Sequence, residues 1–168
     1  TINMTIDGAV ISDNSASSLG GGIYLRSNSS KLYTNLIIGS GSITGNTAGS
    51  DGGGIYAVKG PQLNVSKSMV KLNGGTISSN TATNSGGGVS VYGLKVQCDT
   101  DADGILVTGN RSDTYYGGGI HLEDGASFTM NSGTVADNTS AECGGGVFVR
   151  NSEMIQNGGT ISGNASST

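Results

Sequence analysis

The 168-residue sequence has one proline, no tryptophan and two cysteines, and only 12% of its residues are charged. A collagen-like triple helix is excluded, because it needs proline and a regular glycine register. Two cysteines form one disulfide at most, which excludes a disulfide-stapled scaffold. No apolar run is long enough for a transmembrane helix, so we expect no membrane insertion. Eight Lys and Arg residues are scattered among twelve acidic ones, which argues against nucleic acid as a partner.

Glycine, by contrast, is abundant and recurs in a pattern. It occupies 31 positions, and a glycine triplet followed by Ile or Val occurs five times. Upstream of each triplet, Ile or Val is followed three positions later by asparagine. With a sixth copy after the last triplet, these asparagines are 26 to 34 residues apart: Asn14, Asn46, Asn80, Asn110, Asn138 and Asn164. The chain therefore consists of successive repeats of about 30 residues each.

Apolar residues alternate in three segments of each repeat, as strands require. One segment leads to the asparagine, one follows the glycines (Ile23 and Leu25), and one precedes the next repeat (Leu36 and Ile38). Three short strands per repeat, without a helix, predict an all-β parallel β-helix, or β-solenoid, of about five to six coils. We expect residues 1–168 to form a single domain that is a piece of a longer array. End-to-end stacking of such subunits into an extracellular filament is the alternative.

The repeated asparagines are expected to form a structural column inside the solenoid. An amide both donates and accepts hydrogen bonds, so each side chain can bond the asparagine above it and the one below. Asparagine also tolerates the left-handed backbone conformation that a sharp turn requires. Because catalytic residues do not recur in every repeat, we expect this column to stabilise the fold.

The combination of Gly-Gly-Gly-Ile/Val with Ile/Val-x-x-Asn resembles the surface repeats of bacterial adhesins. It is similar to the repeats of the chlamydial polymorphic outer membrane proteins, which have Gly-Gly-Ala-Ile and Phe-x-x-Asn. This resemblance implies a right-handed, pectin-lyase-like β-helix that is secreted or displayed on a bacterial cell surface. It also implies a stalk or passenger of an adhesin, with a host surface protein or glycan as partner.

The segment Asp99–Gly104 is the most local chemical signal. Its alternating aspartates, closed by glycine, match the first half of a calcium-binding loop. Asp99, Asp101 and Asp103 would supply carboxylates and Ile105 a backbone carbonyl. A bidentate glutamate is missing, because Asn110 occupies the twelfth position. The segment therefore predicts either a weak calcium site or an acidic turn inserted between two coils.

A second signal lies on the strand that follows the glycines. Its outward positions are Tyr24, Tyr56, Ser90, His121 and Phe148. Rings in register stand about 4.8 Å apart, close enough to stack. The stripe formed by Tyr24, Tyr56, His121 and Phe148 is either a sugar-binding platform or a ladder of rings that braces the solenoid.

We expect no enzymatic activity. Glycoside hydrolysis needs two carboxyl groups about 5–9.5 Å apart, and only the Asp99–Asp103 segment brings acidic residues together in sequence. The sequence thus predicts an adhesin-like β-helix acting as rigid spacer or ligand-binding face, with a carbohydrate-active β-helix as the alternative. In place of a host partner, the chain could bind further copies of itself through the open ends of the solenoid.

Overall fold

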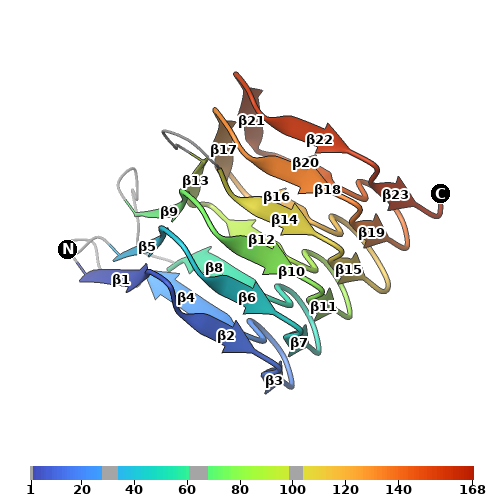
Figure 1. The fold of residues 1–168 in the computed structure, drawn as a ribbon. Coiled ribbons are helices and arrows are strands. Elements are labelled where there is room, and N and C mark those ends of the chain that lie inside the picture. The colour runs from blue at the N-terminus through green and yellow to red at the C-terminus, as the bar shows by residue number, and fades with distance from the viewer. Residues whose placement is uncertain (1, 28–33, 61–67, 99–103) are drawn as a thin grey trace.

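The computed structural model describes residues 2–27, 34–60, 68–98 and 104–168. Within these residues the chain winds as a β-solenoid of four parallel sheets, to each of which every coil contributes one strand, except that the last coil has none in the fourth sheet (Figure 1). The first coil, in blue, and the last, in red, lie at opposite ends of the stack. No helix capable of crossing a membrane is found in this part of the chain. The predicted all-β solenoid is confirmed.

Four sheets, here called A to D in the order in which each coil meets them, run along the solenoid. Sheet A contains β1 (Ile2–Ile6), β5 (Thr34–Ile38), β9 (Met69–Leu72), β13 (Lys95–Cys98), β17 (Ser127–Met130) and β21 (Glu153–Gln156). Sheet B contains β2 (Val10–Ser12), β6 (Ser42–Thr44), β10 (Thr76–Ser78), β14 (Leu106–Thr108), β18 (Thr134–Ala136) and β22 (Thr160–Ser162). Sheet C contains β3 (Ser15–Ala16), β7 (Thr47–Ala48), β11 (Thr81–Ala82), β15 (Arg111–Ser112), β19 (Thr139–Ser140) and β23 (Ala165–Ser166). Sheet D contains β4 (Ile23–Ser27), β8 (Ile55–Lys59), β12 (Val89–Tyr92), β16 (Ile120–Glu123) and β20 (Val147–Arg150).

Like residues lie over like residues because each strand pairs with its counterpart one coil away. In sheet B, for example, Ile77 pairs with Ile43 on one side and with Val107 on the other. A one-residue slip would turn the inward side chains of a strand to the outside. The unequal repeat lengths are therefore absorbed in the turns between strands.

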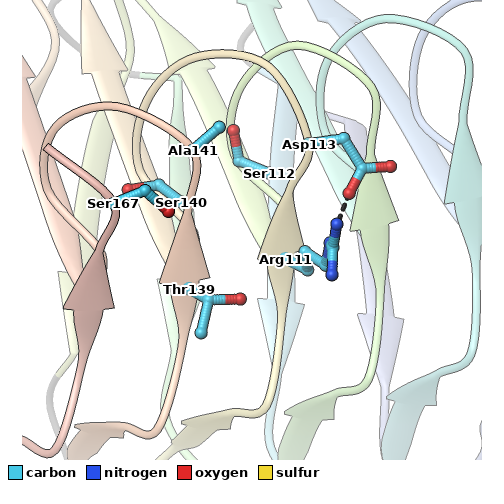
Figure 2. Close-up of a pocket in the computed structure, with 7 residues that line it drawn as sticks. All are labelled: Arg111, Ser112, Asp113, Thr139, Ser140, Ala141 and Ser167. Carbon is cyan, nitrogen blue, oxygen red and sulfur yellow. Dashed lines mark hydrogen bonds and ion pairs between the residues drawn. The ribbon is translucent and has the colours of Figure 1, made fainter.

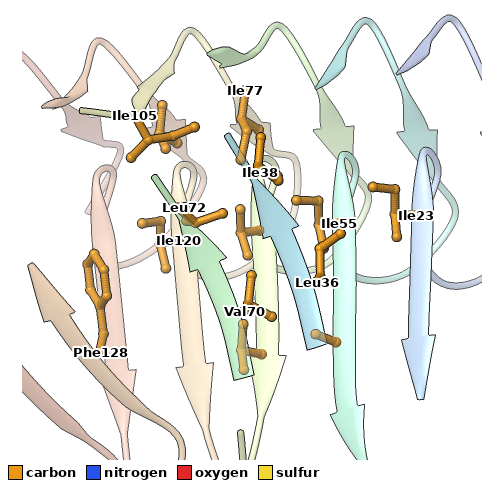
Figure 3. Packing of buried hydrophobic residues seen from close by; sticks show 14 of the residues in the cluster. Ile23, Leu36, Ile38, Ile55, Val70, Leu72, Ile77, Ile105, Ile120 and Phe128 are labelled. Carbon is orange, nitrogen blue, oxygen red and sulfur yellow. The ribbon is translucent and has the colours of Figure 1, made fainter. Parts of the chain in front are cut away.

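Apolar side chains from sheets A, B and D fill the interior. Leu36 and Ile38 of β5, Ile43 of β6 and Ile55 of β8 are all nearly or fully buried. Figure 3 shows side chains of this cluster pointing into the space that the strands enclose. Each such side chain contributes about 1.5–3 kcal/mol on burial. Since the same positions repeat, the core is a continuous column.

The strands of sheet C have two residues each, and the sequence pattern did not predict them. One such strand follows each column asparagine, and its inward residue is small: Ala48 and Ala82, then Ser112 and Ser140 in the same register. Two residues are too few to show alternation, and their inward side chains are too small to mark a core strand. Three strands per coil were expected, and the structure has four.

The glycines of a triplet leave no room for a side chain, as the second triplet illustrates. Gly52 has a φ of +69°, a conformation that side chains disfavour. A Cβ on Gly53 would lie 2.4 Å from the carbonyl oxygen of Gly87 in the next coil. A Cβ on Gly54 would lie 2.7 Å from the carbonyl oxygen of Gly88 and 3.1 Å from the side-chain amide of Asn80. The triplet thus combines a turn, a close approach of two coils and a contact with the asparagine column.

The six asparagines form a continuous hydrogen-bonded column, and Asn80 shows the pattern. Its Oδ1 accepts from the backbone N–H and from Nδ2 of Asn46, both at 2.9 Å. Its Nδ2 donates to Oδ1 of Asn110 and to the backbone carbonyl of Ile43, also at 2.9 Å. The same Nδ2–Oδ1 bond joins every neighbouring pair from Asn14 to Asn164.

The asparagines themselves do not adopt the left-handed conformation that was expected of them. The residue immediately before each one does, with φ between +55° and +67°: Asp13, Gly45, Ser79, Gly109, Asp137 and Gly163. This earlier residue makes the turn, and the asparagine is left free to direct its amide inward. The expectation placed the turn one residue too late.

Candidate functional site

The predicted ring stripe lies on the outer face of sheet D, in register from coil to coil. Tyr24 stacks on Tyr56 with ring centroids 5.6 Å apart, and His121 stacks on Phe148 at the same distance. Exposure differs sharply along the stripe, because Tyr24 is 47% exposed whereas His121 is 1% exposed. The stripe is therefore not a uniformly open platform.

Two tyrosines outside the stripe, Tyr92 and Tyr116, pack against its rings. Ser90 lies between Tyr56 and His121 in the register and leaves room for a ring. The ring of Tyr92 lies 5.5 Å from both Tyr56 and His121. Tyr116, from the turn before a glycine triplet, stacks on Phe148 with centroids 4.3 Å apart.

These tyrosines form one wall of a groove of about 340 Å³, which we call the aromatic groove. Five of its residues come from the turns before three successive glycine triplets: Asp51, Asn84, Ser85, Tyr115 and Tyr116. Four come from the outer face of sheet D: Tyr92, His121, Glu123 and Arg150. The volume is at the lower end of the roughly 300–1,000 Å³ range of small-molecule sites. Of the four predicted stripe residues, His121 alone is among these lining residues.

The single cation of the groove lining is held by a carboxylate. Arg150 donates from Nε to Oε1 of Glu123 at 2.7 Å, and its Nη2 bonds the same oxygen. The guanidinium carbon also lies 5.8 Å from the centre of the Tyr116 ring, within reach of a cation–π interaction. Arg150 is thus engaged on two sides.

Asp51 is the second carboxylate of the groove. Its Oδ1 accepts from the backbone N–H of Ser85 at 3.0 Å, and its Oδ2 accepts from the Ser50 hydroxyl at 3.1 Å. Burial raises the pKa of Asp51 despite these two hydrogen bonds. Burial, reinforced by the charge of Asp51, also raises the pKa of Tyr56 to about 12, so that ring keeps its proton.

His121 joins the two outward columns of sheet D. Its Nδ1 lies 3.1 Å from the Ser90 hydroxyl, and its Nε2 lies 3.4 Å from Oε2 of Glu123. The latter distance is too long for a good hydrogen bond, and the buried Nε2 has no other partner in the described structure. Burial, helped by the nearby Arg150 charge, lowers the pKa of His121 to about 4. The imidazole is therefore neutral at neutral pH.

Ser90, His121 and Glu123 are the residue types of a hydrolytic triad, arranged in that order. Ser90 is 0% exposed, however, and its hydroxyl lies beneath the outer side chains of sheet D. A substrate carbonyl has no route to this oxygen. The arrangement therefore orients the imidazole rather than providing a nucleophile.

A second pocket, of about 280 Å³, lies along sheet C. Arg111 and Asp113 pair with each other there, and the remaining lining is small and polar (Figure 2). Because the guanidinium is already paired and no ring lines the pocket, it offers a ligand less than the aromatic groove does.

The predicted calcium ligands Asp99, Asp101 and Asp103 lie outside the described residues. Ile105 is described: it is 1% exposed, and its carbonyl oxygen accepts a hydrogen bond from the N–H of Thr134 at 2.8 Å. Among the described residues, no cluster of three or more His, Cys, Asp or Glu side chains could hold a metal ion.

The sequence did contain a signal for the groove residues that the stripe omits. Tyr115 and Tyr116 directly precede a glycine triplet, where other repeats have Ser50-Asp51 and Asn84-Ser85. Tyr92, Glu123 and Arg150 occupy one outward column, two residues after the stripe. Alignment of these two columns would have placed bulky and charged side chains side by side.

Two segments match a known repeat. Residues 8–26 and 40–58 both match the Chlamydia polymorphic membrane protein repeat. The chain thus contains two segments that are similar to this repeat. The two matched segments are the same structural unit one coil apart, since each runs from sheet B through the asparagine and the glycine triplet into sheet D. Chlamydia polymorphic membrane protein repeats indicate a surface-associated protein. In comparisons with curated proteins and with solved structures, nothing matched the chain.

Proposed function

We propose that this β-solenoid is a non-enzymatic, adhesin-like protein of the cell surface that binds host glycans in the aromatic groove. The other coils act as a rigid spacer that holds the groove in place. The observation that carries the proposal is the groove itself, in which three tyrosine rings face two carboxylates and an arginine. The surface association indicated by the Chlamydia polymorphic membrane protein repeats agrees with this role.

The lining of the groove suits a sugar better than a wholly apolar ligand. Tyrosine rings offer flat apolar faces, against which the C–H face of a pyranose can pack. Asn84, Ser85 and the two carboxylates offer donors and acceptors for hydroxyl groups. The parallel ladders on both sides hold these side chains in fixed register, which lowers the entropy lost on binding.

The test is a glycan array probed with the purified chain and with two single variants. Tyr115 is 42% exposed and lines the groove, so Tyr115→Ala is expected to weaken binding at least tenfold without loss of the fold. Tyr24 is 47% exposed and does not line it, so Tyr24→Ala is the matched control and is expected to retain binding. Binding that depends on Tyr24 and not on Tyr115 would contradict the groove and favour the stripe. An array without any bound glycan would contradict the proposal as a whole.

A carbohydrate-active β-helix is the second candidate function, because two carboxyl groups line one groove. The pKa of Asp51 is raised by burial, as in a general acid, while Glu123 is paired with Arg150. Incubation with the bound glycans, followed by assay for new reducing ends or unsaturated products, separates the two. Product formed by the wild type and abolished in Asp51→Asn would overturn the non-enzymatic proposal.

A further inference from the structure

We propose that the aromatic groove selects sugars that carry a free amino group and rejects sugars that carry a carboxylate. This inference rests on the glycan-binding function proposed above and names the ligand class for the same site. Its basis is the balance of charge and the placement of rings within the groove.

The charge balance of the groove lining is negative. Asp51 and Glu123 supply two carboxylates, and Arg150 is the one cationic residue among the lining residues. Glu123 holds Arg150 through both Nε and Nη2, so the guanidinium is already engaged. In the described structure Asp51 has hydrogen bonds from Ser50 and Ser85 and no cationic partner. A uronic or sialic acid would therefore bring a third carboxylate to a site whose one cation already neutralises Glu123.

An ammonium group meets favourable partners in the same space. The faces of tyrosine rings attract cations, and Tyr92, Tyr115 and Tyr116 all line the groove. The Asp51 carboxylate adds a charge-assisted hydrogen bond, which is about twice as strong as one between neutral groups. The Asp51 carboxylate, which has no cationic partner in the described structure, and the exposed ring of Tyr115 thus favour a protonated amine over an acetamide of similar shape.

The decisive comparison is between two oligosaccharides that differ only in acetylation, and an acidic oligosaccharide is measured beside them. Binding of a β-1,4-linked glucosamine trimer, of its fully N-acetylated form and of a galacturonic acid trimer is measured by calorimetry at pH 6.5. We expect the amino trimer to bind at least tenfold more tightly than the acetylated trimer, and the acidic trimer not to bind. Equal affinity for the amino and acetylated trimers, or tighter binding of the acidic trimer, would overturn the inference.

Two variants, each of which lacks one carboxylate, test whether Asp51 causes the preference for the amino trimer. Asp51→Asn keeps an Oδ1 to accept from the Ser85 N–H, and it is expected to reduce the preference for the amino trimer about tenfold. Asp113→Asn removes a carboxylate beside the other pocket and is the matched control, with no change expected. A preference that survives Asp51→Asn would overturn the inference.

Failure of this inference differs from failure of the proposed function. Glycans that bind in a Tyr115-dependent way, but without regard to amino groups, contradict the charge selection alone. If neither these trimers nor any glycan of the array binds, both proposals fall.

Discussion

Replacement of Asn80 by alanine tests how much the asparagine column stabilises the solenoid. Asn80 is 0% exposed and takes part in four side-chain hydrogen bonds to neighbouring coils. Each contributes about 0.5–1.5 kcal/mol net. The buried N–H of Asn46 also loses the acceptor that Asn80 provides, at a cost of about 1–3 kcal/mol. The lower bounds of these terms add to about 3 kcal/mol, so we expect Asn80→Ala to lower the free energy of unfolding by at least that much.

The matched control lies in the same column. Asn14 is exposed, and its side chain donates a single hydrogen bond, to Oδ1 of Asn46 at 2.8 Å. Asn14→Ala should therefore cost less than about 1 kcal/mol. Asn80→Asp keeps the shape but replaces the donor by an oxygen that faces two acceptors, Oδ1 of Asn110 and the Ile43 carbonyl, so it should be at least as damaging as alanine at pH 7.

Urea unfolding followed by far-UV circular dichroism at pH 7 measures these differences from the transition midpoints. A loss in Asn80→Ala no larger than in Asn14→Ala would refute the reasoning. It would mean that parallel ladders and apolar burial hold the coils together without help from the amides.

The remaining predictions concern a glycine and a histidine. Gly53→Ala is expected to prevent folding or to lower the melting temperature severely, because its Cβ would lie 2.4 Å from the carbonyl oxygen of Gly87. Gly39→Ala is the control and should be tolerated, because the nearest atom to its Cβ would be 3.7 Å away. Thermal unfolding compares the two variants, and similar melting temperatures would contradict the close approach of the coils at Gly53. Because burial lowers the pKa of His121 to about 4, the unfolded chain binds a proton between about pH 6.5 and 4 that the folded chain does not. Stability should therefore fall by up to about 3 kcal/mol as the pH falls through this window, and His121→Gln should flatten the dependence in urea titrations. A slope that His121→Gln leaves unchanged would show that other groups cause it.

Spacing in the sequence was sufficient to predict the solenoid, because the register of parallel strands forces the same side-chain types to recur. Ile77 and Asn80 have counterparts in neighbouring coils at every step, and one periodicity locates both the core and the column. The two-residue strands of sheet C escaped because they carry one small inward side chain each. These strands are defined by a turn of the backbone and by hydrogen bonds to the next coil, and neither alters the pattern of apolar residues in the sequence.

The aromatic groove was harder to predict than the stripe beside it. Tyr24 and Tyr56 stack as their common position implies. Tyr92 and Tyr116 break the repeat: the ring of Tyr92 lies between those of Tyr56 and His121, and the ring of Tyr116 stacks on Phe148. That outcome depends on side-chain volume and rotamers across three coils, which a one-dimensional pattern does not contain. The burial of His121 beneath neighbouring rings depends on the same factors.

The direction of the ladders has a mechanical consequence. Hydrogen bonds between strands join one coil to the next, so in all four sheets they run along the axis of the stack (Figure 1). A pull between the two ends of the stack loads the successive interfaces in series, and each interface can open without first breaking those beyond it. Under tension this solenoid should therefore yield in a row of small steps, each releasing about 30 residues of slack, rather than rupture once at a high force.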